Sequence, residues 1–249
     1  MYQVSLSGRA AIITGGTKGI GKASAQRLAM AGLAGLTIVS RNPNEALFAE
    51  LEALGTQVEF VQGDVSQEAT AKAAVEATVK RFGRLDVLFN NAGATATSPI
   101  DTLTVEEWDH TAAVNARGVF LFTKYASAVM KEQHKGSIIN MASIAGVTGG
   151  TTSADYAAAK AGVIGFTRYI GRQLAPFGIR VNALAPGTTE SELMRSVWSG
   201  ERLKQKVASI PLGRMAQPEE IADVVLFLAS DMSSYICSET ICVSGGRYW

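Results

Sequence analysis

Short apolar runs alternate along the chain with longer segments whose apolar residues recur at helical spacing. The apolar runs predict strands at 10–16, 36–40, 58–65, 85–93, 136–143, 179–187 and 239–246. The periodic segments predict helices at 20–31, 45–55, 68–83, 105–133, 157–174 and 218–230. Because the strand segments are continuous apolar runs, they favour an α/β fold with a parallel sheet covered on both faces. No linker, repeat or low-complexity segment interrupts this alternation, so we expect one domain over residues 1–249.

The stretch 188–215 has the weakest pattern and carries scattered charges. A loop of this length in a compact domain is usually a lid or a binding loop. We therefore expect 188–215 to cover a substrate, with Leu193, Met194, Val197 and Trp198 as apolar candidates. The alternative is an amphipathic helix that packs on the body of the protein.

Composition and charge exclude several functional classes. The chain of 249 residues has a net charge of +1, which does not indicate a nucleic-acid partner. It contains no apolar run long enough to span a bilayer and no signal-peptide pattern at its start, so we expect a soluble cytoplasmic protein. We expect Cys237 and Cys242 to be reduced and to hold no metal ion.

A glycine-rich turn, "TGGTKGIG" from Thr14 to Gly21, joins the first predicted strand to the first predicted helix. Glycines at such a turn let a diphosphate approach the helix N-terminus, where backbone N–H groups and the helix dipole favour an anion. The spacing differs from G-x-G-x-x-G, and glycine turns also close purely structural strand–helix units. By itself this motif favours nucleotide binding only moderately.

Tyr156 and Lys160 stand four residues apart in "ADYAAAKAG". On a helix they share one face, and a neighbouring ammonium would lower the pKa of the phenol towards working pH. A phenol of that kind is a suitable general acid and base. The alternative is an ordinary pair on a helix surface.

Taken in order, these segments resemble the short-chain dehydrogenases/reductases over nearly the whole chain. The matching segments are "TGGTKGIG", "NNAG" at 90–93, Asn115 in "VNARG", Ser143, and Tyr156 with Lys160. The resemblance implies a Rossmann-type, doubly wound fold with a seven-stranded parallel sheet. It also implies a cofactor half at about 1–140 and a catalytic and substrate half at about 141–249.

The resemblance also implies roles for individual residues. Tyr156 would exchange the proton, Ser143 would orient the substrate oxygen, Lys160 would contact the nicotinamide ribose, and Asn115 would hold a water that completes a proton relay. Asn90 is a further residue of "NNAG" expected to line the cofactor, whereas His110 and His134 match no site. The residues expected to contact the cofactor are Gly15, Thr17, Lys18, Gly19, Ile20, Gly21, Ser40, Arg41, Asp64, Val65, Asn91, Ala92, Gly93, Tyr156, Lys160, Pro186, Gly187, Thr189 and Ser191.

The residues after the second predicted strand favour NADP(H), with NAD(H) as the alternative. Ser40 stands where relatives that prefer NAD carry an acidic residue, and Arg41 follows it. Arg41 and Lys18 could both bind a 2′-phosphate, unless they are solvated surface cations. Asp64 and Val65 are expected at the adenine, although Asp64 could instead cap a helix.

We expect an oxidoreductase that interconverts a ketone and a secondary alcohol, with a small ketone, a sugar, a polyol or a steroid as the substrate. The alternatives are a 3-oxoacyl carrier-protein reductase, an NAD-dependent sugar or polyol dehydrogenase, and, least favoured, a cofactor-binding regulator without turnover. Phe177 and Ser137 stand where carrier-protein reductases often have Arg, which disfavours the first alternative. By the resemblance, we expect a homotetramer, or a homodimer, and no nucleic-acid or membrane partner.

Overall fold

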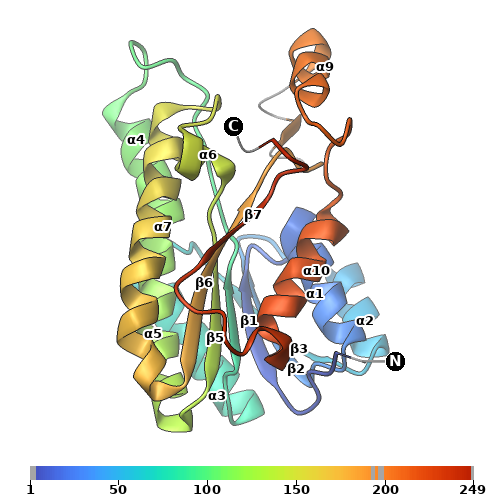
Figure 1. Ribbon diagram of the computed structural model, residues 1–249. Coiled ribbons are helices and arrows are strands. Elements are labelled where there is room, and N and C mark those ends of the chain that lie inside the picture. Colours follow the sequence, from blue (N-terminus) through green and yellow to red (C-terminus); the bar gives the residue numbers. More distant parts are fainter. Residues whose placement is uncertain (1–3, 192–193, 196–198, 248–249) are drawn as a thin grey trace.

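A seven-stranded parallel sheet forms the centre of the protein (Figure 1). The structure is a computed structural model, and it describes residues 4–191, 194–195 and 199–247. The strand order is β3-β2-β1-β4-β5-β6-β7, and every neighbouring pair is parallel. This arrangement confirms the predicted Rossmann-type, doubly wound fold. The strands are β1 (Ala10–Thr14), β2 (Gly35–Ser40), β3 (Gln57–Gln62), β4 (Val87–Asn90), β5 (Gly136–Met141), β6 (Ile179–Pro186) and β7 (Thr240–Val243).

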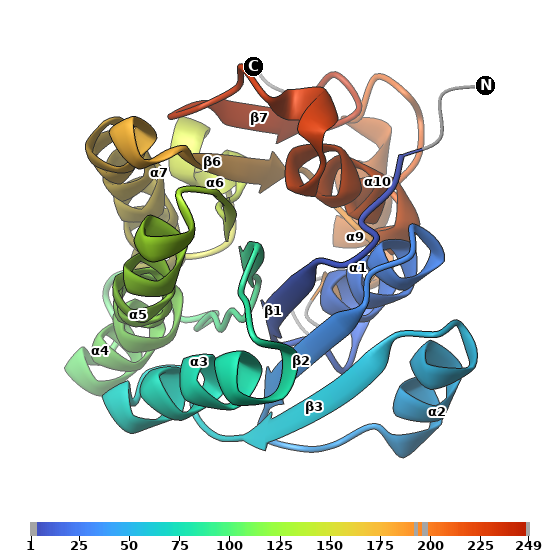
Figure 2. The same ribbon diagram turned by 90° about the horizontal axis from the view of Figure 1, so that it is seen from below.

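Helices cover both faces of the sheet, as the view from below shows (Figure 2). Helices α1, α2 and α10 lie on one side, and α3, α4, α5 and α7 lie on the other. Helices α6 and α9 lie beyond the carboxyl ends of the strands, at the top of Figure 1. The bounds are α1 (Gly19–Met30), α2 (Glu45–Ala53), α3 (Glu68–Phe82), α4 (Val105–Ala112), α5 (Gly118–Gln133), α6 (Ile144–Thr148), α7 (Ala154–Leu174), α9 (Gly200–Ala208) and α10 (Pro218–Ala229).

The alternation of side chains along β1 explains why its first four residues are all apolar. Ala11 and Ile13 belong to the core cluster that includes residues of α1, α2 and α10. Ile12 points the other way, into the cluster that includes residues of α3, α5 and α7. A strand with helices on both faces must be apolar at successive positions, and all five residues of β1 are buried.

The predicted helix 105–133 is interrupted by one turn of π-helix at Ala113–Arg117, between α4 and α5. The side chain of Asn115 is fully buried there, and its Nδ2 donates to the carbonyl oxygen of Thr111 at 2.9 Å. A side-chain donor that occupies a backbone carbonyl competes with the regular helical ladder. Helix α7 also differs slightly from expectation, because it begins at Ala154 rather than at 157 and so includes Tyr156 in its first turn.

The stretch 188–215 is not a simple loop, because it contains α9 and a parallel bridge between Thr189 and Ala216. Of the apolar candidates there, Leu193, Val197 and Trp198 lie outside the described residues. Met194 is 9% exposed. Within the described residues, Cys237 and Cys242 form no disulfide bond. Within the described residues, no helix combines the length and the hydropathy that crossing a bilayer would require.

Candidate functional site

A cavity of about 580 Å³ opens at the carboxyl ends of the strands. It lies where the strand order reverses between β1 and β4, which is the usual ligand position in open α/β sheets. Of the residues predicted to take part in catalysis or cofactor binding, all except Gly21, Asn90 and Asn115 line this cavity. Sequence positions more than 200 residues apart therefore meet around one space, from Gly15 after β1 to Arg247 after β7.

The glycine turn after β1 is fixed to the "NNAG" segment after β4. Thr14 Oγ1 accepts hydrogen bonds from the backbone nitrogens of Asn91 and Ala92, at 2.9 and 3.0 Å. Asn91 Nδ2 donates to the carbonyl oxygens of Thr14 and Gly15, at 2.9 and 3.1 Å. Gly15 has a φ of +64°, and a Cβ there would lie 3.0 Å from the Cα of Ala92. The turn is therefore close-packed and rigid before any ligand binds.

This part of the cavity fits a nicotinamide dinucleotide. The backbone of the glycine turn leads into the N-terminus of α1, and the first turn of α1 contains no acidic residue to repel a diphosphate. A side chain on Gly21 would fill the place where Gly15 and Asn91 meet, since its Cβ would lie 2.2 Å from the Gly15 carbonyl oxygen. Gly21 is thus buried beneath the turn rather than on the cavity wall. Its lack of a side chain lets α1 pack closely against Gly15 and Asn91.

The rim beyond β2 combines cations with a hydroxyl. Ser40 Oγ lies 3.0 Å from Thr17 Oγ1, and the exposed Arg41 and Lys18 line the same end of the cavity. Asp64 Oδ1 accepts a hydrogen bond from the Ser66 backbone nitrogen at 2.8 Å. That bond, together with the charges of His110 and Arg41, holds the pKa of Asp64 below its usual value. Asp64 therefore acts as a local cap while it also lines the cavity.

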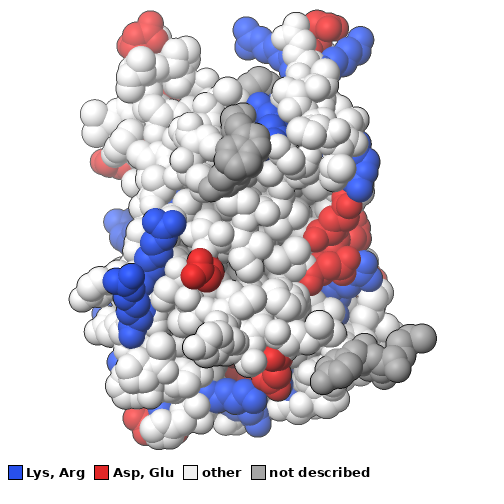
Figure 3. All heavy atoms as spheres, viewed as in Figure 1, with Lys and Arg blue, Asp and Glu red and all other residues white. Residues whose placement is uncertain are grey.

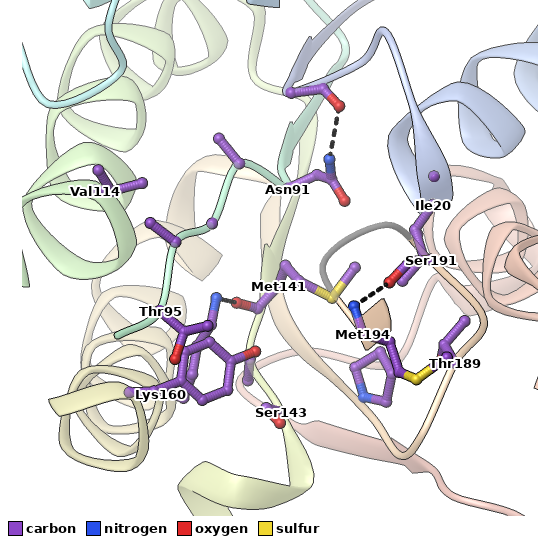
Figure 4. A pocket seen from close by; sticks show the side chains of 18 of the residues that line it. Ile20, Asn91, Thr95, Val114, Met141, Ser143, Lys160, Thr189, Ser191 and Met194 are labelled. Carbon is purple, nitrogen blue, oxygen red and sulfur yellow. Dashed lines mark hydrogen bonds between the residues drawn. The ribbon is translucent and has the colours of Figure 1, made fainter. Parts of the chain in front are cut away.

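Two of the residues expected to carry the chemistry, Ser143 and Lys160, lie on the cavity wall close to Met141 at the end of β5 (Figure 4). Ser143 precedes α6, and its Oγ accepts a hydrogen bond from the Ala145 backbone nitrogen at 3.1 Å. Tyr156 is hydrogen-bonded to Ser143 through its side chain. Lys160 Nζ donates to the carbonyl oxygen of Met141 at 2.7 Å and lies 5.6 Å from the centre of the Tyr156 ring. The spacing of four residues thus places the ammonium beside the Tyr156 ring.

The expectation that Lys160 lowers the pKa of Tyr156 is wrong for this structure. Burial disfavours the phenolate and raises the pKa of Tyr156, while the hydrogen bond with Ser143 opposes that rise. Burial also disfavours the ammonium and lowers the pKa of Lys160 to about 7. Both effects share one cause, because an apolar surrounding penalises the charged form of each group.

Replacing Lys160 with Met is expected to stabilise the cofactor-free protein at pH 6. Lys160 is 1% exposed, and its pKa of about 7 lies well below the usual value near 10.5. The unfolded chain binds this proton more tightly between those values, so the native protein gains stability as pH rises through that window. Below pH 7 Lys160 is charged in both the native and the unfolded protein, so the native protein bears the full cost of burying the ammonium. Removing that cost should raise Tm by about 5 °C. Thermal scans of both proteins at pH 6, 8 and 10 test this, and the difference should shrink with rising pH.

The matched control for that series is Lys72→Met, because Lys72 is 60% exposed on its side chain. Its Tm should differ from that of the parent protein by the same small amount at every pH. A Lys160→Met protein that melts at or below the parent temperature at pH 6 would contradict the penalty assigned to the buried ammonium.

Asn115 lies behind the cavity wall, in the π-helical turn. Its Nδ2 donates to the Ala94 carbonyl oxygen at 2.6 Å, in addition to Thr111. Its buried Oδ1 accepts no hydrogen bond from the described residues, although a buried oxygen of this kind ordinarily has a partner. A Cβ on Gly93 would lie 3.1 Å from that oxygen and 3.8 Å from Lys160 Nζ. The acceptor is thus available on the side where Lys160 lies.

One predicted residue is placed elsewhere, and several cavity residues were missed. Asn90 is buried between strands, where its Nδ2 donates to Asn140 Oδ1 at 2.8 Å, so Asn91 rather than Asn90 lines the cavity. His110, which matches no site in the resemblance, lines the cavity. Thr151, Lys206 and Arg247 also line it, and no motif in the sequence points to them.

Comparisons with known proteins agree with this geometry. Residues 15–247 match the profile of a protein family described as enoyl-(acyl carrier protein) reductase. The chain is 39% identical over 242 residues to a 3-oxoacyl-[acyl-carrier-protein] reductase of Thermotoga maritima, covering 97% of this chain and 98% of that one. Levodione reductase shares the fold with a TM-score of 0.91 at 35% identity, covering 98% of both chains. A short-chain type dehydrogenase/reductase from Mycobacterium marinum has a TM-score of 0.89 at 32% identity, covering 98% of this chain and 96% of that one. With this fold, this cavity and these relatives, the chain belongs to the short-chain dehydrogenase/reductase family of oxidoreductases that use a nicotinamide cofactor.

Proposed function

We propose that this protein is an NADP(H)-dependent oxidoreductase that interconverts a ketone and a secondary alcohol. The observation that carries the proposal is the partly exposed pair of Tyr156 and Ser143, hydrogen-bonded to each other beside the buried Lys160 on the cavity wall. A phenol and a hydroxyl that face one space can both contact a single carbonyl oxygen. The bound cofactor supplies or accepts the hydride.

In this proposal the side chains manage the proton and the position of the substrate. Ser143 donates a hydrogen bond that orients the carbonyl oxygen, and Tyr156 donates its proton to that oxygen during reduction. In alcohol oxidation Tyr156 accepts the proton. Lys160 lies within 5.6 Å of the Tyr156 ring and favours the phenolate when it is charged. The available Asn115 Oδ1 supports the assignment of Asn115 to a water that links Lys160 to solvent.

A reduction of 3-oxoacyl groups on a carrier protein is the second candidate, because a relative at 39% identity bears that name. The residues at 137 and 177 disfavour this candidate less than their sequence positions predict. Ser137 is 3% exposed and donates to the Leu228 carbonyl oxygen, so its identity says nothing about a docking surface. Phe177 is partly exposed, with Lys131 Nζ 4.9 Å from the centre of its ring. A cation therefore remains at this place despite the loss of an arginine.

We also propose that the protein forms a homotetramer or a homodimer. The face shown in Figure 3 is largely uncharged around β7. Large apolar or aromatic side chains are exposed on other elements, including Phe120 on α5 (47%) and Tyr169 on α7 (71%). Low charge and exposed aromatic groups are typical of surfaces that associate.

Replacing Arg41 with Ala is expected to weaken NADPH binding about tenfold and to leave NADH binding within about twofold. Arg41 lines the cavity beyond β2, and only NADPH carries a phosphate for it to bind. Fluorescence titration of both cofactors measures the effect. Ser40→Asp should act in the same direction, because a carboxylate repels the 2′-phosphate and can accept hydrogen bonds from a ribose hydroxyl.

Arg172→Ala is the control, since Arg172 is exposed on α7 and does not line the cavity. If the parent protein binds NADH as tightly as NADPH, the assignment of Arg41 and Lys18 to a phosphate is wrong. A screen of short ketones and a 3-oxoacyl thioester with the preferred cofactor then separates the two candidate functions. If no carbonyl compound is turned over, the proposed reaction fails.

A further inference from the structure

Three segments far apart in the sequence converge on one end of the cavity. Lys206 of α9 donates from Nζ to Thr151 Oγ1 at 3.0 Å, and Thr151 lies in the connection between α6 and α7. Arg247, after β7, donates from Nη1 to Thr188 Oγ1 at 3.4 Å. These four residues line the same cavity as Ser143 and Tyr156. The two hydroxyls therefore fix two cationic side chains at its wall.

Positive charge is concentrated in this cavity beyond what the composition explains. The chain has 23 Lys and Arg against 22 Asp and Glu. The described residues that line the cavity include five Lys and Arg and one acidic residue, Asp64. The proposed function uses Lys18 and Arg41 at the cofactor phosphate and Lys160 beside Tyr156. It gives no role to Lys206 and Arg247.

The environment of Lys206 indicates a place suited to a negative charge. Burial, and then the charge of Arg247, lower the pKa of Lys206 to about 8. Two cations held this close repel each other, and an anion between them would remove that cost. Guanidinium binds carboxylate or phosphate oxygens in a fork, and ammonium adds a point charge.

We propose that Lys206 and Arg247 form the anion-binding end of the substrate pocket, so that the preferred substrate is a ketone or secondary alcohol carrying a carboxylate or a phosphate ester. The proposal rests on the proposed function for the reacting end of the same molecule. Ile144 and Met194 also line the cavity and offer apolar contact to a short carbon chain. The anion fixes one end of that chain, and the carbonyl lies at Ser143 and Tyr156.

Binding of unreactive probes tests this site without any turnover. Calorimetric titration of the NADPH-loaded protein with hexanoate, hexyl phosphate and hexanamide compares two anions with a neutral molecule of similar length. We expect at least one anion to bind tenfold or more tightly than hexanamide, and Lys206→Gln or Arg247→Gln to remove most of that difference. The anion that binds more tightly shows whether the preferred substrate carries a carboxylate or a phosphate ester. If NADPH does not bind, the same titrations are made on the cofactor-free protein.

Turnover provides the second readout. The ratio of kcat/KM for 5-oxohexanoate to that for its methyl ester should fall at least tenfold in Lys206→Gln, mainly through KM for the anion. Lys204→Gln is the matched control, because Lys204 lies on the same helix with 78% of its side chain exposed and pairs with Glu201. It should leave the ratio unchanged.

Equal binding of the two anions and hexanamide would overturn the proposal. So would an anion preference that both variants retain. If the protein binds the anions through Lys206 but reduces no ketone, the anion site is supported and the proposed reaction is contradicted. If it reduces neutral ketones with no preference for anions, the reaction is supported and the anion site is contradicted.

Discussion

Replacing Tyr156 with Phe is expected to lower kcat for ketone reduction at least a hundredfold while NADPH binding changes less than about threefold. The variant loses only the hydroxyl that is hydrogen-bonded to Ser143. The ring itself remains, and Lys160 Nζ stays 5.6 Å from its centre, so the wall of the cavity keeps its shape. Steady-state kinetics and a fluorescence titration on the same preparation separate the two quantities.

Tyr169→Phe is the matched control for this experiment. Tyr169 lies on the same helix, α7, but it is 71% exposed and does not line the cavity. Removing the Tyr169 hydroxyl should leave kcat within about twofold of that of the parent protein. If Tyr156→Phe turns over ketones at a rate within tenfold of the parent protein, Tyr156 is not the proton donor and the proposed roles must be reassigned.

Replacing Gly21 with Ala is expected to reduce the free energy of unfolding by about 3 kcal/mol and to weaken NADPH binding at least a hundredfold. The new Cβ would lie 2.2 Å from the Gly15 carbonyl oxygen and 2.6 Å from Asn91 Nδ2. Those two atoms belong to the hydrogen bonds that fix the glycine turn to the segment after β4. Neither can move without disturbing the other, so α1 must shift and the turn must open. Urea unfolding and NADPH titration measure the two effects.

The same substitution at Gly165 should have the opposite sign. Gly165 lies inside α7, and a Cβ there meets no atom within 4 Å. Alanine in an exposed helix interior should stabilise the protein by about 0.5–1 kcal/mol, because it restricts the unfolded chain. If both variants change stability equally, close packing at Gly21 is not the reason for its glycine.

The sequence alone predicted the sheet because its strands are buried on both faces. β1 is apolar at its first four positions, and this is a signal that needs no knowledge of its partners. Tyr156 and Lys160 could be placed side by side, since that depends only on spacing along one helix, whereas Ser143 and Asn115 were proposed from the family resemblance. The cavity lining around Ser143 followed from the resemblance.

Other parts of the site could not be predicted because they depend on how distant segments meet. Lys206 and Arg247 lie 41 positions apart, and nothing in either local sequence indicates a shared cavity. The contact of Lys160 with the Met141 carbonyl oxygen depends on depth of burial, which spacing does not reveal. Asn90 and Asn91 are adjacent and identical in type, so only the end of β4 decides which one enters the cavity.

The order of strands has a consequence for how the chain matures during synthesis. β1 lies between β2 and β4, and its pairing with β4 begins at Val87. Until the ribosome has released that segment, β1 has one unpaired edge, and both of its faces are apolar. Such an edge is a template for pairing with another chain. The edge of β1 is therefore open to pairing with another chain until β4 is made, and the unpaired edge then passes to β4 until β5 follows.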